Sequence, residues 1–318
     1  MDIAATPENE NKPAAAPVRK PQLRWYWRVL RGFVIVYLSL LIFLYFAQKG
    51  LIFIGANTQG QPGAKIPRFV KGEVLTLKSA SGETICALFG PALTKGGNPD
   101  PQARNRPTLL FFYGNAMCLS DAAQDFHDFR LLGFNVMIPE YSGFGLSSGE
   151  PSEKGCYETA DAAYEYLQQR PGIDKSKIVV CGWSLGGAVA IDLASRKSVA
   201  GLMTFSAFTS MAAMGSETYP FFPKLAISLV LKHPFKSDEK IGLVKCPILI
   251  GHSRGDKIIP FEMSEQLSAA AKTKVTRLTL DGLDHAEFFS GGGDKVLNAI
   301  QSFTARVCEV NDHANVNH

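Results

Sequence analysis

The sequence lacks the short motifs that commonly hold metals and nucleotides. It contains no H-E-x-x-H motif, no cluster of paired carboxylates and no Walker-type phosphate loop. Its six cysteines include no C-x-x-C pair and no spacing typical of a zinc site or a disulfide framework. We therefore expect no metal or other cofactor, and we expect most of the cysteines to be thiols in the core.

Strong charge of one sign is also missing. The net charge of +4 is modest, and the basic residues do not form a stripe with interleaved aromatic residues. A nucleic-acid partner is therefore not expected. The chain of 318 residues has no apparent internal repeat. Without its two ends, it suits one α/β domain of about 240 residues.

The two ends of the chain are polar. Residues 1–24 are rich in Pro, Ala, Asn and charged residues and have almost nothing apolar to bury, which predicts a disordered tail. Residues 309–318 are predicted to form a second, polar tail.

Residues 25–49 are predicted to form a transmembrane anchor. The stretch 32–48 has no charged residue, and three aromatic residues, Trp25 to Trp27, stand before it as interfacial anchors. A cleaved signal peptide is an alternative, but Gln48-Lys49-Gly50 does not provide the small-x-small site that cleavage needs. A core helix, the third alternative, should be shorter or amphipathic.

Basic residues are more frequent before this apolar run than after it. Those before it are Lys12, Arg19, Lys20, Arg24, Arg28 and Arg31, and those in the comparable stretch after it are Lys49, Lys65 and Arg68. The positive-inside rule then predicts a cytoplasmic N-terminus and an extracytoplasmic domain in a single-pass membrane protein.

Residues 50–69 are predicted to be a linker, because Gly, Gln and Pro gather near residue 60. The globular domain is expected over residues 70–308. It opens with two alternating segments, Glu73–Lys78 and Thr84–Phe89, which a Ser-Gly turn separates. This pattern predicts an antiparallel hairpin.

Strands and helices alternate through the rest of the domain. Predicted strands cover 108–112, 135–138, 177–181, 200–205, 246–251 and 275–280, and predicted helices cover 122–132, 153–169, 187–196 and about 294–307. The glycines before Asp294 predict a flexible joint, with Asp294 capping the last helix. This alternation predicts an α/β fold: a mainly parallel sheet with helices on both faces and ligands at the carboxyl ends of its strands.

Residues 206–241 are longer than an ordinary crossover and rich in apolar residues. They predict a small helical cap over the site. A plain crossover helix packed on the sheet is the alternative, because caps and core helices use the same residue types.

Ser184 is the candidate nucleophile. It lies in Gly182-Trp-Ser-Leu-Gly186, a G-x-S-x-G pattern between a predicted buried strand and an Ala-rich helix. Small residues let strand and helix pack closely around an exposed serine, which needs a base to remove its proton. An ordinary strand-to-helix turn is the alternative interpretation.

His285 is the candidate base, because it follows the last predicted strand at the sheet edge. Asp256, in the loop after the preceding strand, is the candidate acid that orients it, although a plain turn aspartate is possible there. The order Ser, Asp, His along the chain is that of this architecture. Asp281 and Asp284 are rivals, and Asp284 ranks below Asp256 because adjacent side chains seldom meet at the needed angle.

The developing oxyanion needs two backbone N–H donors. Leu185, the residue after the nucleophile, is predicted to supply one. Asn115 in the loop after the first parallel strand is predicted to supply the other, with Ala116 as the alternative. Arg254 and Lys257 are expected to be solvated loop charges.

With these residues assembled, residues 70–307 resemble the α/β-hydrolase superfamily. The similarity is greatest to its membrane-anchored, serine aminopeptidase-like branch, which includes lipases with an α/β-hydrolase domain and acyl-protein thioesterases. The resemblance rests on Tyr113-Gly-Asn-Ala116, Glu140-Tyr-Ser-Gly-Phe-Gly-Leu-Ser-Ser-Gly149, Gly182-Trp-Ser-Leu-Gly-Gly187 and the turns holding Asp256 and His285. It implies the α/β-hydrolase fold.

Two positions depart from the family pattern. Tyr113 replaces the histidine that usually precedes the oxyanion glycine, and Gly251-His252 inverts a common His-Gly order. The first departure concerns the shape of the oxyanion loop, although backbone amides do not depend on that side chain.

These observations predict a membrane-anchored serine hydrolase that cleaves an ester, thioester or amide through an acyl-enzyme on Ser184. The anchor and the apolar cap suggest a small-molecule, lipid or acylated substrate. A serine aminopeptidase is an alternative within the enzymes. A catalytically silent hydrolase fold that serves as a binding or scaffold protein is the alternative outside them.

The charge asymmetry makes the topology testable. Protease added to the extracytoplasmic side of sealed membranes should digest the domain of residues 70–308 and spare a cytoplasmic control protein. Digestion that requires permeabilised membranes would contradict the predicted topology.

Overall fold

The structure, a computed structural model, describes residues 23–316, with the side chains of residues 25–309. The chain divides into two units, residues 1–43 and 44–318. Most of the predicted disordered tail, 1–24, and part of the C-terminal polar tail lie outside the described residues.

The first helix, α1 (Leu23–Ile52), begins in the first unit and ends in the second. Its segment Trp25–Ile52 is long and apolar enough to span a membrane. A signal sequence near an N-terminus has the same properties. The expected long apolar helix is therefore confirmed, while membrane insertion and topology stay predictions.

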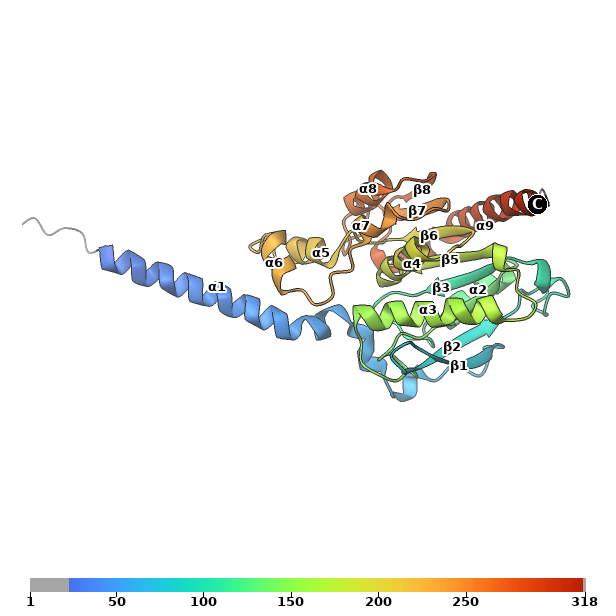
Figure 1. Ribbon diagram of the computed structural model, residues 1–318, viewed down its shortest axis with the longest axis horizontal. Coiled ribbons are helices and arrows are strands. Elements are labelled where there is room, and N and C mark those ends of the chain that lie inside the picture. The colour runs from blue at the N-terminus through green and yellow to red at the C-terminus, as the bar shows by residue number, and fades with distance from the viewer. Residues whose placement is uncertain (1–22, 317–318) are drawn as a thin grey trace, which may run out of the picture. The chain divides into compact units, whose positions relative to one another are not determined.

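The second unit is built on an eight-stranded sheet in the order β1-β2-β4-β3-β5-β6-β7-β8 (Figure 1). The strands are β1 (Glu73–Lys78), β2 (Thr84–Gly90), β3 (Thr108–Phe112), β4 (Asn135–Pro139), β5 (Ile178–Trp183), β6 (Gly201–Phe205), β7 (Ile248–Ser253) and β8 (Val275–Leu280). The first two strands form the predicted antiparallel hairpin, and β2 also pairs antiparallel with β4. All other pairs are parallel.

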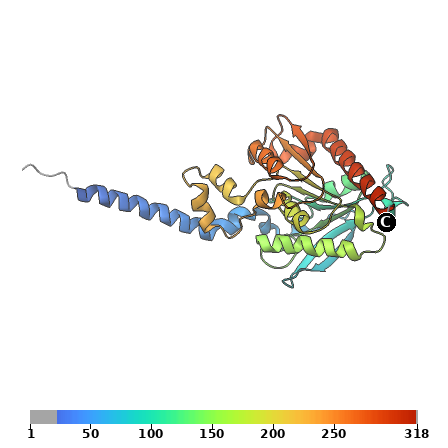
Figure 2. The same cartoon turned by 45° about the horizontal axis from the view of Figure 1, so that its top comes forward.

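Helices cover both faces of this sheet (Figures 1 and 2). One face carries α3 (Glu153–Gln169), α4 (Leu185–Arg196), α7 (Ser237–Ile241) and α8 (Phe261–Ala270), which contact one another in that order. The other face carries α2 (Ala123–Leu131) and α9 (Phe288–Val316). Phe111 of β3 packs against Phe129 of α2 and Phe289 of α9, which joins these two helices through the core. The predicted α/β-hydrolase arrangement is confirmed.

Local sequence signals explain several helix ends. Helix α3 has the predicted bounds, and its N-cap Ser152 accepts a hydrogen bond from the Gly155 N–H. The last helix, α9, begins earlier than expected and extends to Val316. Gly293, with φ 45°, breaks it at the glycine joint that the sequence indicates.

Residues 50–69 are folded onto the domain rather than forming a plain linker. Phe53 is buried in the core, and two short 3₁₀ helices follow it at Ile54–Thr58 and Pro62–Ala64. The Gly55 N–H donates to the Asn115 carbonyl at 2.8 Å. A Cβ at Gly55 would lie 2.4 Å from that oxygen, so only glycine permits this approach.

Residues 206–241 contain two helices, α5 (Met211–Thr218) and α6 (Lys224–Val230), before α7. The first two pack against each other and stand apart from the helices that flank the sheet (Figure 1). This is the arrangement expected of a small cap.

Five cysteines, Cys86, Cys118, Cys156, Cys181 and Cys308, are buried, as expected of core thiols. Burial raises the pKa of the Cys181 thiol far above its ordinary value, because a thiolate would be poorly solvated there. This agrees with a structural rather than a redox role for Cys181.

The contact between α4 and the end of β3 predicts a stability effect at Gly186. A Cβ there would lie 2.0 Å from the Phe112 carbonyl oxygen, a backbone atom that cannot move aside. Gly186→Ala should lower the free energy of unfolding by about 2 kcal/mol or more, which lowers the melting temperature by about 6 °C. At Gly63 nothing lies within 4 Å of an added Cβ, so Gly63→Ala is the matched control. Equal thermal denaturation curves for the two variants would contradict the prediction.

Candidate active site

Ser184 occupies a strained turn between β5 and α4. Its φ of 55° and ψ of −118° are rare for a residue other than glycine. The turn is possible because Gly182 has no Cβ. A Cβ there would lie 2.0 Å from the Gly186 carbonyl oxygen, so glycine is needed at position 182 for the strand and helix to meet. The Ser184 N–H donates to the Phe205 carbonyl of β6 at 2.9 Å. The predicted strand, turn and helix around the serine are therefore present.

Ser184, His285 and Asp256 form one continuous hydrogen-bonded line. The His285 Nε2 lies 3.0 Å from the Ser184 Oγ, and the His285 Nδ1 lies 2.7 Å from the Asp256 Oδ2. His285 begins a short 3₁₀ helix after β8, and Asp256 lies in the loop after β7. All three side chains are buried or nearly so. The parallel sheet thus brings together residues that are up to 101 positions apart in sequence.

The Trp183 ring supports the imidazole from one side. Its ring centroid lies 5.3 Å from that of His285, with an angle of 26° between the two planes. This stacking restricts the orientation of the imidazole, which the Asp256 carboxylate also restricts through the Nδ1.

Asp256 is held in its ionised form. Burial alone would raise the pKa of this carboxyl group, but hydrogen bonds from His252, His285 and the Ile259 N–H outweigh it. The pKa of Asp256 therefore lies well below its ordinary value. The Asp256 Oδ1 also accepts from the N–H groups of Ile258 and Ile259, at 2.9 and 2.8 Å.

His252 is a residue of the site that the sequence reasoning missed. Its buried Nε2 lies 3.2 Å from the Asp256 Oδ2 and 3.0 Å from the Ile259 carbonyl oxygen. The histidine is the penultimate residue of β7, four residues before the acid, and in the sequence it was notable only for the inverted order Gly251-His252. The spacing of four residues across the end of a strand was the available signal, but it does not by itself show which way the side chain turns.

The rival carboxylates have other partners. Asp281 is exposed and pairs with Arg254 at 2.9 Å. Asp284 pairs with Lys257 at 3.0 Å and caps the 3₁₀ helix through the His285 N–H. The geometry therefore favours Asp256 as the partner of His285, and Arg254 and Lys257 are surface charges as expected.

The predicted oxyanion donors lie beside the serine. Leu185, Asn115 and the alternative Ala116 line the same cavity as Ser184. The Asn115 carbonyl accepts a hydrogen bond from the Gly55 N–H. Because C=O and N–H point in opposite directions in a planar trans peptide, the Ala116 N–H of the same peptide points away from Gly55. The role of these amides stays a prediction.

Tyr113, which replaces the usual histidine, anchors the oxyanion loop from below. Its hydroxyl donates to the Glu140 Oε1, and the Tyr141 hydroxyl donates to the Tyr113 carbonyl at 2.9 Å. Glu140 also accepts from the N–H groups of Leu119 and Leu146. Burial raises the pKa of both Tyr113 and Glu140. The buried hydrogen bond between Tyr113 and Glu140 thus connects the loop around Asn115 to the segment 140–149.

A cavity of about 540 Å³ opens onto Ser184 and His285. Its lining is mostly aliphatic, aromatic or Met side chains. They come from the cap (Phe208, Met211, Met214, Ile227, Val230, Leu231), from the end of α1 and the residues after it (Leu44, Leu51, Ile52, Ile54) and from the loop holding Ile258 and Ile259.

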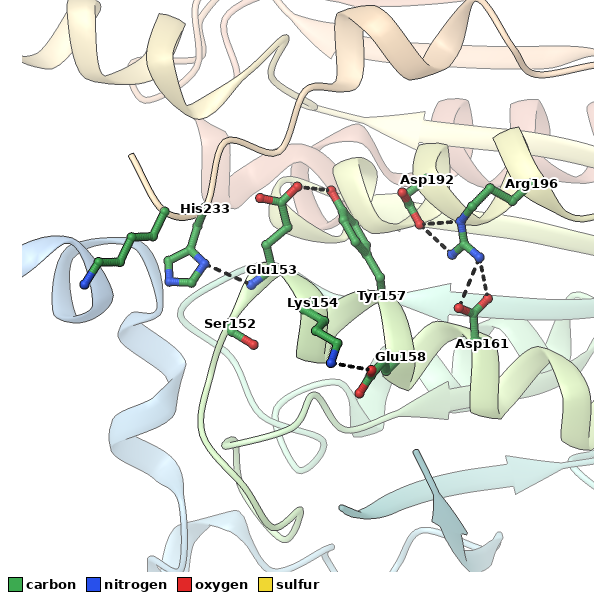
Figure 3. Close-up of a pocket in the computed structure, with 10 residues that line it drawn as sticks. Ser152, Glu153, Lys154, Tyr157, Glu158, Asp161, Asp192, Arg196 and His233 are labelled. Carbon is green, nitrogen blue, oxygen red and sulfur yellow. Dashed lines mark hydrogen bonds and ion pairs between the residues drawn. The ribbon is translucent and has the colours of Figure 1, made fainter. Parts of the chain in front are cut away.

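A second, polar pocket of about 390 Å³ lies elsewhere, over α3 and α4 (Figure 3). Its carboxylates pair with cations that line the pocket or lie beside it. Arg196 contacts Asp161 at 3.0 Å and Asp192 at 2.6 Å, and Lys154 contacts Glu158 at 3.3 Å. Lys240, outside the lining, contacts Asp192 at 2.7 Å and Glu153 at 3.8 Å. Neither Ser184 nor His285 lines this pocket, and its carboxylates are paired without a ligand.

Comparisons with known proteins agree with this architecture. Residues 144–289 match the model of the dienelactone hydrolase family. The chain is 31% identical over 266 residues to the uncharacterized protein Rv2307c of Mycobacterium tuberculosis, covering 83% of this chain and 90% of that protein. It is 31% identical over 224 residues to the protein bem46 of Schizosaccharomyces pombe, covering 69% of this chain and 73% of bem46.

Similarity extends to other proteins with this fold. The α/β hydrolase domain-containing protein aho-3 of Caenorhabditis elegans is 34% identical over 186 residues, which cover 58% of this chain and 54% of aho-3. The solved structure of the Pyrococcus furiosus esterase Pf2001 superposes with a TM-score of 0.56 at 15% identity, covering 75% of this chain and 91% of the esterase. At that identity the likeness shows the fold alone.

The chain belongs to the α/β-hydrolase superfamily. It is a hydrolase of the α/β-hydrolase type.

The low pKa of Asp256 predicts a pH-dependent stability. A carboxyl group whose pKa is lower in the folded state stabilises the fold above the unfolded pKa, and this stabilisation is lost as the pH falls further. Asp256→Asn should therefore cost about 2 kcal/mol near neutral pH, and the difference from the wild type should shrink below about pH 4.

Denaturant titrations at a series of pH values would measure this difference. The control Asp281→Asn removes an exposed surface pair and should change stability by less than about 1 kcal/mol at every pH. A cost of Asp256→Asn that is independent of pH would count against an ionised Asp256.

Proposed function

We propose that this protein is a serine hydrolase that cleaves an ester bond through an acyl-enzyme on Ser184. The observation that supports it most is the line from Ser184 Oγ through His285 to Asp256, with both contacts at 3.0 Å or less. This is the arrangement in which an imidazole can take the hydroxyl proton and an aspartate can hold the imidazole in the correct tautomer.

In the first half of the reaction, the Ser184 Oγ attacks the carbonyl carbon of the ester. The His285 Nε2 takes the hydroxyl proton, and Asp256 stabilises the imidazolium that forms. The oxyanion accepts hydrogen bonds from the N–H groups of Leu185 and Asn115, and the N-terminus of α4 adds a favourable dipole. His285 then protonates the leaving oxygen, and the alcohol departs.

In the second half, a water molecule takes the place of the alcohol. His285 removes a proton from this water as its oxygen attacks the acyl carbon. The tetrahedral intermediate collapses, the proton returns to the Ser184 Oγ and the free acid is released. A thioester would follow the same steps with a thiol as the leaving group.

Membrane anchoring through residues 25–49 is part of this proposal. The length and apolar character of α1 support it. In this arrangement the N-terminus is cytoplasmic and the catalytic domain is extracytoplasmic, as the distribution of basic residues predicts.

The alternatives have less support. A silent scaffold would have no need of a strained serine turn or of a carboxylate aligned on His285. An aminopeptidase must hold the charged amino group of its substrate, and none of the described residues that line the cavity is Asp or Glu. These observations favour an esterase.

A fluorophosphonate probe tests the proposal directly. The folded wild type should be labelled covalently, and Ser184→Ala should abolish the labelling, because the probe reacts only with an activated serine. Asp256→Asn should slow labelling by about a thousandfold or more, while the surface control Asp281→Asn should label at the wild-type rate. A folded wild type that takes up no probe, or labelling that persists in Ser184→Ala, would overturn the proposal.

A further inference from the structure

The cavity at Ser184 is walled in part by the last turns of α1. Leu44, Gln48, Leu51 and Ile52 of that helix line it, and so does Ile54 just after the helix. All of these residues belong to the same unit as the catalytic domain. The end of the helix predicted to be an anchor is therefore also part of the wall around the candidate nucleophile.

Gln48 bonds this wall to the cap. Its side chain is buried, and its Nε2 donates to the carbonyl oxygens of Tyr45 and Val230, at 2.8 and 3.1 Å. Its Oε1 accepts from the Lys232 N–H at 2.7 Å. One carboxamide thus satisfies backbone groups on α1 and on the segment at the end of α6. If the two segments separated, these buried polar groups would lose their hydrogen-bond partners, which costs free energy.

A second contact strengthens the same junction. The Lys232 Nζ lies 3.9 Å from the centroid of the Tyr45 ring, within range of a cation–π interaction. Because Val230 and Leu231 line the cavity, the position of the cap wall depends on the position of the helix end.

The chemistry of the lining limits what the cavity can hold. None of the described residues that line it is Lys, Arg, Asp or Glu. A charged group close to the scissile bond would lose its hydration there and gain no partner. A flexible aliphatic chain would gain free energy from each methylene that it buries.

We propose that residues 44–52 of α1 form part of the substrate site, and that this site selects a neutral ester with a long unbranched acyl chain, such as a monoacylglycerol. The acyl chain of the substrate lies between Leu44 and Leu51 of the helix and the cap residues Met214 and Ile227, and its ester carbonyl lies at Ser184. This inference rests on the proposed function. The apolar run of α1 adjoins the lining residues in sequence, so the membrane that holds the anchor also supplies the substrate.

The chain-length preference of the full-length protein in detergent micelles tests this proposal. For p-nitrophenyl acetate, butyrate, octanoate and palmitate, kcat/KM should rise by up to about fourfold for each added methylene, until the cavity is filled. Leu44→Trp and Leu51→Trp should each lower the ratio of kcat/KM for the palmitate ester to that for the acetate ester by roughly tenfold or more, because the indole fills the space of the long acyl chain.

Leu229→Trp is the matched control, because Leu229 lies on α6, is 80% exposed and is not among the lining residues. It should keep the wild-type profile. If acetate and palmitate esters react equally in the wild type, or both helix variants keep its profile, the proposal is wrong although the proposed function stands. If Ser184 neither reacts with the fluorophosphonate probe nor turns over acetate, the proposed function itself fails.

The leaving group is tested with one acyl chain on three carriers. Monopalmitoylglycerol should be hydrolysed roughly tenfold faster than palmitoyl lysophosphatidic acid, which adds only a charged phosphate group to the headgroup. It should also be preferred to an S-palmitoylated peptide. A preference for the lysophospholipid or for the peptide would overturn the assignment of a neutral ester.

Discussion

The close contact between β5 and α4 is the constraint on which the site depends. Strand and helix can meet only because Gly182 has no Cβ, and the missing Cβ of Gly186 lets α4 approach Phe112 at the end of β3. Between these two glycines Ser184 takes a backbone conformation that most residues avoid. Strain of this kind persists only where the surrounding structure maintains it. Here the surrounding structure is a buried parallel sheet with helices on both faces. The result is a hydroxyl presented at the carboxyl edge of the sheet, where the loops after β7 and β8 bring Asp256 and His285 into line with it.

Two buried polar clusters hold the rest of the site in place, and each satisfies its own charges. Asp256 accepts hydrogen bonds from two histidines and two backbone N–H groups, so its negative charge is stabilised in a buried position. Glu140 accepts from the Tyr113 hydroxyl and from two other backbone N–H groups beneath the oxyanion loop. Because burying an unpaired charge costs several kcal/mol, clusters that are this well satisfied resist rearrangement. The position of His285 and the shape of the loop around Asn115 follow from them.

Two pockets of the described domain differ in the chemistry of the residues that line them, which distinguishes a candidate binding site from a network of surface ion pairs. The pocket over α3 and α4 is rich in charge, but its carboxylates already pair with cations, among them Arg196 with Asp161 and Asp192 (Figure 3). The cavity at Ser184 is lined by apolar side chains around a few polar groups, which is the usual character of a small-molecule site. Its wall is shared between the cap and the end of α1, and Gln48 joins the two. The end of α1, residues 44–52, thus forms part of the cavity wall beside Ser184.

The sequence by itself determined the elements whose signals are local. Alternation predicted β1, a capping serine predicted the start of α3, and the glycine pattern with its flanking strand and helix predicted the turn at Ser184. The order of Ser184, Asp256 and His285 along the chain identified the residues that the structure brings together. Tertiary structure alone decided that His252 turns toward Asp256, that residues 50–69 pack onto the domain and that Gln48 bonds the cap across more than 180 positions of sequence. These contacts depend on how buried surfaces fit together in three dimensions, and a one-dimensional pattern of residue types carries no record of that fit.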